Sequence, residues 1–143
     1  MRIRPRLLFL LSLLPLMAAG GSRTHNSLNW DALGRKGGVT LKSGYKEYVG
    51  HPDVEQKWDL QLSGAPPLTK VVVQVRGGDL LAPTTDVDGR LDLLITTSAP
   101  AVEASTGRPG RGDRLDAGDA VRVYDPQSGE FIEAYYRYIG TGD

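Results

Sequence analysis

Acidic side chains are concentrated in one short stretch of the chain, Thr84–Asp92, where Asp86, Asp88 and Asp92 fall within seven residues. Proteins bind calcium through several carboxylate and carbonyl oxygens, often on a loop that a glycine bends, and Gly89 lies inside this stretch. The three aspartates are therefore the candidate calcium ligands of this sequence.

This stretch does not follow the ligand spacing of an EF-hand. Counted from Thr84, the twelfth residue is Ile95, where that motif requires a glutamate. The competing interpretation is a hairpin turn whose Asp and Gly residues serve backbone geometry. The sequence leaves the calcium site and the turn open, and we expect no other cofactor.

Aromatic side chains supply the second candidate site. Tyr135, Tyr136 and Tyr138 follow one another closely, and Trp58 lies in a separate segment. Aromatic rings that carry a polar group suit partly hydrated binding surfaces, so these four residues are a candidate platform for carbohydrate or peptide. In an extended chain Tyr136 and Tyr138 point to one side and Tyr135 to the other. Packing in the core is therefore the alternative role for these tyrosines.

The sequence contains no recognisable catalytic arrangement. A Gly-x-Ser-x-Gly elbow is absent, and two histidines (His25 and His51) without any cysteine do not favour a zinc or copper centre. Carboxylates are numerous, but the sequence does not place two of them at the separation that glycoside hydrolysis needs. Arg111-Gly112-Asp113 is interpreted as a chance tripeptide in a variable loop. We therefore expect that the protein is not an enzyme.

Strands must position these candidate residues. Apolar and polar side chains alternate in Gln56–Ser63, and Lys70–Thr97 indicates two strands joined through the acidic loop. Ala120–Tyr124 and Glu130–Ile139 predict a hairpin across a turn that contains Pro and Gly. We predict an all-β fold, a small antiparallel β-sandwich of Ig-like or prealbumin-like type, with a lipocalin-like β-barrel as the alternative.

The first twenty residues have the anatomy of a secretory signal peptide. Arg2, Arg4 and Arg6 precede an apolar run, Leu7–Met17, which small residues follow at Ala18–Gly21. The apolar run is shorter than the ~20 residues that a membrane-spanning helix requires. We expect cleavage of this segment, no membrane span afterwards, and a periplasmic or secreted location.

The chain of 143 residues is thus divided into three parts. We expect a signal peptide at 1–20, a flexible N-terminal segment at 21–37 and a single β domain at 38–143. Residues 21–143 contain 14 basic and 17 acidic side chains, a balance that gives no electrostatic basis for binding nucleic acid or an anionic membrane. Without cysteine, the domain must be stabilised by core burial alone.

A resemblance is visible around the acidic loop. Thr84–Ile95 (TTDVDGRLDLLI) and the preceding Gly64–Leu68 (GAPPL) resemble the turn and following strand of carboxypeptidase-regulatory-like, prealbumin-type and bacterial Ig-like domains, over about residues 60–97. The resemblance implies an exported β-sandwich accessory module without catalytic residues. Such domains often finish with an aromatic-glycine-tyrosine element, whereas this chain has the long Ser98–Asp119 connection.

A shorter likeness lies near the N-terminus. His25–Trp30 (HNSLNW) is similar to the mature N-terminus of copper-resistance envelope lipoproteins, which carry a small lipocalin-like barrel. That likeness implies an envelope-stress or metal-resistance accessory protein. The lipid-bearing cysteine and the Cys-x-x-Cys motif of that family are absent from this chain, so the sensing chemistry is not implied.

The sequence as a whole predicts an exported, non-catalytic binding or assembly module with an unidentified protein or cell-envelope partner. We expect its contacts to come from the Ser98–Asp119 loop or from pairing of the Tyr135–Tyr138 strand with a partner. A lipocalin-like carrier of a small apolar ligand is the alternative function.

Overall fold

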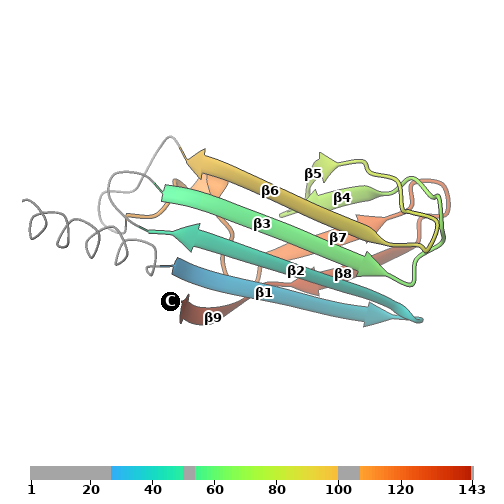
Figure 1. The fold of residues 1–143 in the computed structure, drawn as a ribbon, viewed down its shortest axis with the longest axis horizontal. Coiled ribbons are helices and arrows are strands. Elements are labelled where there is room, and N and C mark those ends of the chain that lie inside the picture. Colours follow the sequence, from blue (N-terminus) through green and yellow to red (C-terminus); the bar gives the residue numbers. More distant parts are fainter. Residues whose placement is uncertain (1–26, 50–53, 100–106, 143) are drawn as a thin grey trace, which may run out of the picture.

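The computed structural model describes residues 27–49, 54–99 and 107–142, and their fold is all-β (Figure 1). One short 3₁₀ turn, η1 (Arg111–Asp113), is the only helical element of these residues. The strands are β1 (Ser27–Lys36), β2 (Val39–Tyr48), β3 (Val54–Ser63), β4 (Val72–Val75), β5 (Gly78–Leu81), β6 (Leu91–Ala99), β7 (Ala120–Tyr124), β8 (Phe131–Tyr135) and β9 (Arg137–Gly142).

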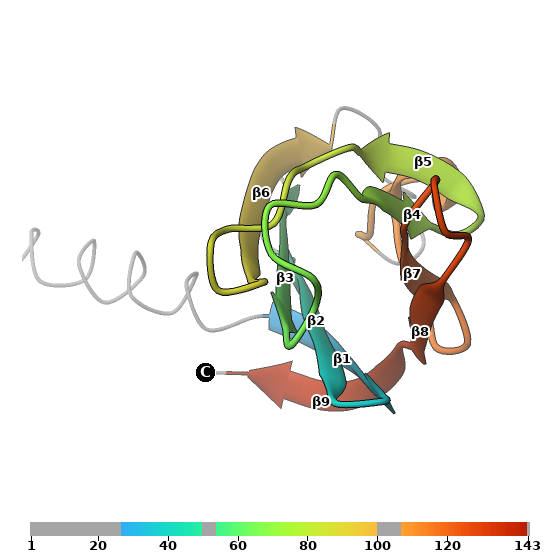
Figure 2. The same ribbon diagram turned by 90° about the vertical axis from the view of Figure 1, so that its right-hand side faces the viewer.

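The strands form two antiparallel sheets that pack face to face, which confirms the predicted β-sandwich. The larger sheet has the order β6-β3-β2-β1-β9, and the smaller sheet has the order β5-β4-β7-β8. Seen end-on, the two sheets surround a common interior without closing into a barrel (Figure 2). The lipocalin-like barrel considered as an alternative is therefore not the fold.

Alternation of apolar residues places the core between the two sheets. In β3 the side chains of Trp58, Leu60 and Leu62 point inward and are buried, as the sequence predicts. Val73 of β4 and Val121 of β7 face them from the smaller sheet with no solvent exposure. Burial of these side chains on facing sheets is the main stabilising contribution to such a fold.

The N-terminal segment departs from expectation. Within 21–37, predicted to be flexible, residues 27–36 form β1, which pairs with β2 along ten residues. The same strand also pairs with β9, where Ser27 lies opposite Gly142. Trp30 is buried in the core with 4 % of its surface exposed. The polar composition of the segment concealed the strand, because the buried residues of β1 besides Trp30 are the small residues Ser27 and Ala32.

The organisation of Lys70–Thr97 also differs from the predicted strand pair. Its first part, β4, lies in the smaller sheet, and its last part, β6, lies at the edge of the larger one. A separate strand, β5, returns beside β4 through a tight turn in which Arg76 and Gly77 have positive φ angles of 54° and 77°. Segment 82–90 then carries the chain across to the other sheet.

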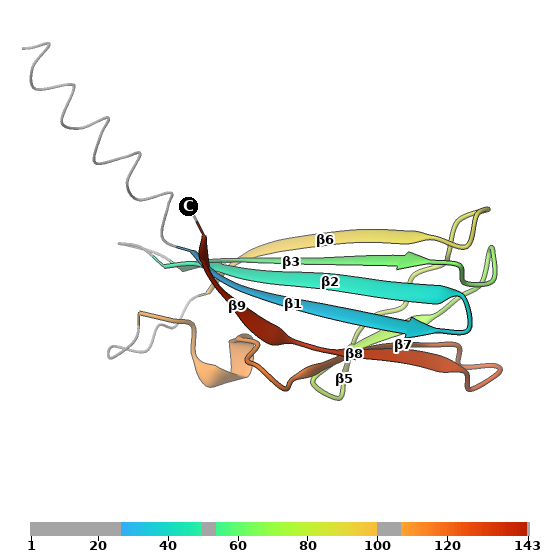
Figure 3. The same ribbon diagram turned by 90° about the horizontal axis from the view of Figure 1, so that it is seen from below.

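On one side of the sandwich the chain passes directly from one sheet to the other. Tyr136 alone separates β8 from β9, so the chain passes there from the smaller sheet to the larger one (Figure 3). Close packing accompanies this crossing, because a Cβ atom added at Gly34 of β1 would lie 2.5 Å from the Glu133 carbonyl oxygen of β8. The opposite side, between β5 and β6, has no such crossing strand in the described residues.

Candidate functional site

A groove opens on the side of the sandwich between β5 and β6. Its volume is about 470 Å³. Apolar side chains from both sheets line it, and two aromatic side chains, Tyr45 and Trp58, reach it from the core. The remaining apolar lining is Val75, Leu80, Ile95 and Leu115. Concave, mostly apolar sites of this size are where proteins commonly bind small molecules or partner side chains.

Arg76 stabilises the rim of this groove through contacts with the segment that contains η1. Its Nη1 atom donates hydrogen bonds to the carbonyl oxygens of Arg114 (3.1 Å) and Gly112 (3.4 Å). Its Nε atom lies 3.7 Å from the Asp119 carboxylate. These contacts fix the segment that contains η1 against the smaller sheet, so the groove has a defined end.

A buried polar network lies behind the groove and centres on Glu47. Arg108 donates to both carboxylate oxygens of this fully buried side chain, at 2.8 and 3.1 Å, and the Tyr45 hydroxyl donates to Oε1 at 2.8 Å. Gln56 donates to the Tyr45 hydroxyl at 2.9 Å and also to the carbonyl oxygen of Asp113. The network therefore joins segment 107–119 to β2 and β3 of the larger sheet.

The electrostatics of the network follow from its burial. Burial raises the pKa of the Tyr45 hydroxyl well above its ordinary value, with a smaller contribution from the neighbouring Glu47 carboxylate. Hydrogen bonding to Glu47 raises the pKa of the Arg108 guanidinium, whose charge also lies over the Trp30 ring at 4.8 Å from its centroid. Each charged group and hydroxyl of the network is thus hydrogen-bonded to another protein group, as buried polar groups generally are.

The four aromatic residues singled out in the sequence do not form one platform. Trp58 and Tyr136 are buried and hydrogen-bonded to each other, since the Trp58 indole Nε1 donates to the Tyr136 hydroxyl at 2.8 Å. The Ser43 hydroxyl forms a hydrogen bond with the same hydroxyl at 2.6 Å, and burial raises the pKa of Tyr136 to about 12. Both residues belong to the core, although Trp58 also reaches the groove.

Tyr135 and Tyr138, in contrast, are largely exposed, on β8 and β9 respectively. The Tyr135 hydroxyl donates to the Glu133 carboxylate, and this bond raises the pKa of Tyr135. Tyr138 packs on Trp30 with ring centroids 5.3 Å apart. Their edge-pairing role stays a prediction.

The acidic loop adopts a turn in which Asp86 accepts backbone hydrogen bonds. Its Oδ1 atom receives the N–H groups of Asp88 (2.9 Å) and Arg90 (2.8 Å). Asp92 lies one residue inside β6. Within the described ranges, no three acidic or histidine side chains form a group that could hold a metal ion. This geometry supports the turn interpretation, and the calcium site of Asp86, Asp88 and Asp92 stays a prediction that titration can test.

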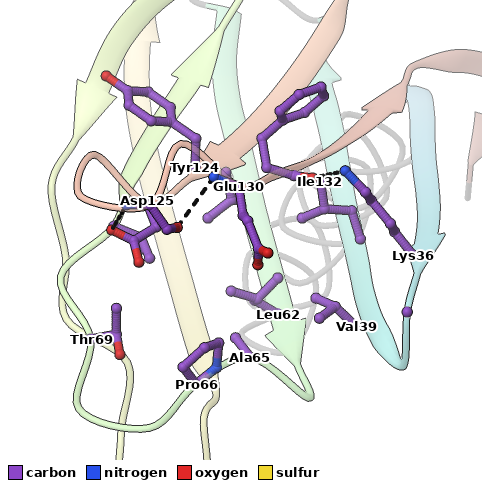
Figure 4. Close-up of a pocket in the computed structure, with 15 residues that line it drawn as sticks. Lys36, Val39, Leu62, Ala65, Pro66, Thr69, Tyr124, Asp125, Glu130 and Ile132 are labelled. Carbon is purple, nitrogen blue, oxygen red and sulfur yellow. Dashed lines mark hydrogen bonds between the residues drawn. The ribbon is translucent and has the colours of Figure 1, made fainter.

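A second cavity, of about 380 Å³, lies at the end of the sandwich near the β1–β2 and β7–β8 turns (Figure 4). Val39, Leu62 and Ile132 are among the apolar residues that line it from the two sheets, and the Glu130 carboxylate points toward them. Lys36 closes one side, because its Nζ donates to the Phe131 carbonyl oxygen at 3.0 Å. The cavity thus combines an apolar floor with charged groups at its rim.

Other residues considered in the sequence fall in different places. His25 and His51 lie outside the described residues. Arg111-Gly112-Asp113 forms η1, and the carbonyl oxygens of Gly112 and Asp113 accept hydrogen bonds from Arg76 and Gln56. The tripeptide backbone is therefore anchored to the domain.

Sequence reasoning missed the Glu47–Arg108 pair and both cavities. The signal for the pair is a charged residue at an inward position of β2, where Leu41, Ser43, Tyr45 and Glu47 alternate with outward residues. The cavities carry no such signal, because their linings come from strands far apart in the chain.

No helix among the described residues has the length and apolar character to span a membrane. Comparison of the chain with protein-family models, curated proteins and solved structures finds no match.

Proposed function

We propose that this protein is an exported, non-catalytic binding or assembly module, whose contact surface is the open side of the β-sandwich. The observation that carries the proposal is the apolar groove between β5 and β6, beside two strands whose outer edges pair with no other strand of the described residues. A free strand edge next to an apolar groove suits an extended peptide segment. Main-chain hydrogen bonds to the edge supply affinity, and alternate side chains enter the groove.

The interior polar groups support a binding role over a catalytic one. Both oxygens of the Glu47 carboxylate are engaged by Arg108, and the Tyr45 hydroxyl bridges Glu47 and Gln56. Groups held this way stiffen the wall behind the groove. A stiff wall lowers the ordering cost that binding would otherwise carry.

The test is peptide binding followed through tryptophan fluorescence. Peptides selected from a random twelve-residue display library against the protein are titrated into it, and tryptophan emission is recorded, because Trp58 lines the groove. We expect saturable changes that Leu80→Lys removes, because Leu80 lines the groove and is 45 % exposed. Val87→Lys is the matched control, since Val87 is 72 % exposed in the acidic loop outside the groove. Selected peptides that bind both variants equally would refute the groove as the site.

The export part of the proposal rests on the signal-peptide anatomy of residues 1–20. The protein is expressed from its full sequence in a bacterial host, and cell fractions are analysed by mass spectrometry. We expect the periplasmic or secreted product to start at residue 21 or 22. A product that keeps Met1 and stays in the cytoplasm would overturn this part.

The end cavity favours a second candidate function, the carrying of a small apolar ligand. Its lining of Val39, Leu62 and Ile132 is apolar, and its volume lies within the range of small-molecule pockets. An environment-sensitive dye such as anilinonaphthalene sulfonate should then bind with enhanced emission. Val39→Trp, which would occupy the cavity, should abolish that signal, whereas dye binding that Val39→Trp leaves unchanged would exclude this function for the cavity.

A further inference from the structure

The free edge of β6 differs from the other three sheet edges. β5 is four residues long and its pairing with β4 contains a register shift. β9 has a register shift against β1 and a positive φ of 111° at Gly140. β8 is short and lies against β1 where Gly34 meets the Glu133 carbonyl oxygen. Short strands, irregular pairing and cover by a neighbour are the usual protection against edge-to-edge association.

In the part of the chain that the structure describes, β6 shows none of these protections. It pairs with β3 through nine consecutive residues without a register shift, and its sequence LDLLITTSA contains neither proline nor lysine. Leu94 points outward from the middle of the strand and is 63 % exposed. A long, regular and apolar edge of this kind is a template for another strand.

We propose that β6 pairs antiparallel with β6 of a second copy of this chain, about a two-fold axis at Leu94. This inference rests on the proposed function, and it identifies the extended segment that binds at the open side as β6 of a second copy. An antiparallel pair of identical strands is self-complementary, which is the requirement for a closed two-fold dimer. The two larger sheets would then join into one continuous sheet across both copies.

The side chains of β6 match in this register. With Leu94 opposite its own copy, Leu93 faces Ile95 on the inner side and Asp92 faces Thr96 on the outer side. The two central inner residues are thus both apolar, Leu91 meets Thr97, and the single charge of the strand meets a hydroxyl instead of a like charge. A register shifted by one residue, centred on Ile95, would oppose Leu93 to Thr97 and Leu94 to Thr96.

The groove provides a further reason for this partner. Leu93 and Ile95 are half-buried against the core, and Ile95 also lines the groove. In the paired arrangement the same two residues of the second copy would lie on the same face of the joined sheet, next to the mouth of the groove. Dimerisation would therefore remove from water an apolar surface that the single copy leaves partly exposed.

The oligomeric state tests the inference. The protein expressed from its full sequence is examined by sedimentation velocity over a range of concentrations, together with Leu94→Lys and Val87→Lys. Leu94→Lys would place two like charges opposite each other at the two-fold axis, so we expect dimerisation at least tenfold weaker. Val87→Lys should dimerise as the unmodified protein does. A dimer that Leu94→Lys leaves intact would overturn the pairing of β6.

The register is tested by cross-linking, since the chain has no cysteine. Opposite residues of antiparallel strands have Cβ atoms about 4.5–5.5 Å apart, close to the reach of a disulfide. Leu94→Cys should give a covalent dimer on mild oxidation, whereas Val87→Cys should not. Equal cross-linking of both variants would overturn the register.

The results separate this inference from the proposed function. An unmodified protein that is monomeric yet binds selected peptides in a Leu80-dependent manner would overturn the second copy as partner and leave the proposed function standing. A monomer that binds no peptide would overturn both.

Discussion

The Glu47 carboxylate on β2 and the Arg108 guanidinium form a bidentate ion pair, with Nε 2.8 Å from Oε2 and Nη2 3.1 Å from Oε1. The two residues are 61 positions apart, and the Glu47 side chain is fully buried. A second contact, from Arg108 Nη1 to the Asp116 carboxylate at 3.0 Å, extends the pair toward the surface. This pair is the main anchor of segment 107–119 on the larger sheet.

Removal of Arg108 should destabilise the protein strongly. Arg108→Met leaves the Glu47 carboxylate buried without its counter-charge, and breaking one partner of such a pair costs about 3–5 kcal/mol. Denaturation in guanidinium chloride measures the loss. The matched control is Arg137→Met, which breaks the exposed ion pair with Asp31 and should cost at most about 1 kcal/mol. Equal losses for the two variants would contradict the importance assigned to burial.

Deprotonation of Tyr136 should contribute to the loss of stability at alkaline pH. Burial raises its pKa to about 12, whereas the unfolded chain has the ordinary value of about 10. Above pH 10 the unfolded state therefore loses this proton first, and stability falls by up to about 1.4 kcal/mol per pH unit until pH 12. Below pH 10 the contribution of Tyr136 is fully present.

The pH dependence can be assigned with Tyr136→Phe. This variant should be less stable at pH 7, because it loses the hydrogen bonds to Ser43 and Trp58. Its stability should also fall less steeply between pH 10 and 12, as measured by chemical denaturation at each pH. Parallel profiles for the two proteins would show that Tyr136 does not cause the alkaline loss.

Gly34 should be intolerant of a side chain. An alanine Cβ there would lie 2.5 Å from the backbone oxygen of Glu133, so β1 and β8 would have to separate. We expect Gly34→Ala to cost about 1–3 kcal/mol, as overpacking does. Gly78→Ala is the control, because its nearest neighbour would be the Val75 oxygen at 3.7 Å. Thermal melts of the two variants should differ by several degrees, and similar melts would argue against close packing at the crossing.

The acidic loop should respond to mutation as a turn. Asp86→Ala removes the acceptor of two backbone N–H groups and should lower stability by about 1 kcal/mol, whereas Asp88→Ala should change it little. Excess Ca²⁺ should not raise the melting temperature. Binding to the native state at a hundredfold excess over Kd would add ~2.7 kcal/mol, so a rise that either substitution abolishes would establish the calcium site.

The sequence predicted the fold class because alternation is clear wherever inward residues are apolar, as in Gln56–Ser63. Alternation is hard to recognise in β1, because Trp30 is the only large side chain among its fully buried residues. In β2 the signal was present but overlooked, since Glu47 continues the inward series of Leu41, Ser43 and Tyr45. The strand pairing assumed for Lys70–Thr97 was wrong because local periodicity does not specify which sheet a strand joins. Of the groove, Trp58 and the Ser98–Asp119 loop, which contributes residues 112–115, were singled out beforehand. That they meet each other and the lining residues of β4, β5 and β6 follows from tertiary structure alone.

The pairing of Ser27 with Gly142 places constraints on the order in which the domain can be assembled during synthesis. A ribosome releases β1 first and β9 last, so β1 has only one of its two neighbours until nearly the whole domain has emerged. The proposed export through a membrane, in the same direction, would impose the same delay. The unfinished edge of β1 would remain open to wrong partners throughout that time, and a chaperone that shields extended segments would act on this protein at that stage.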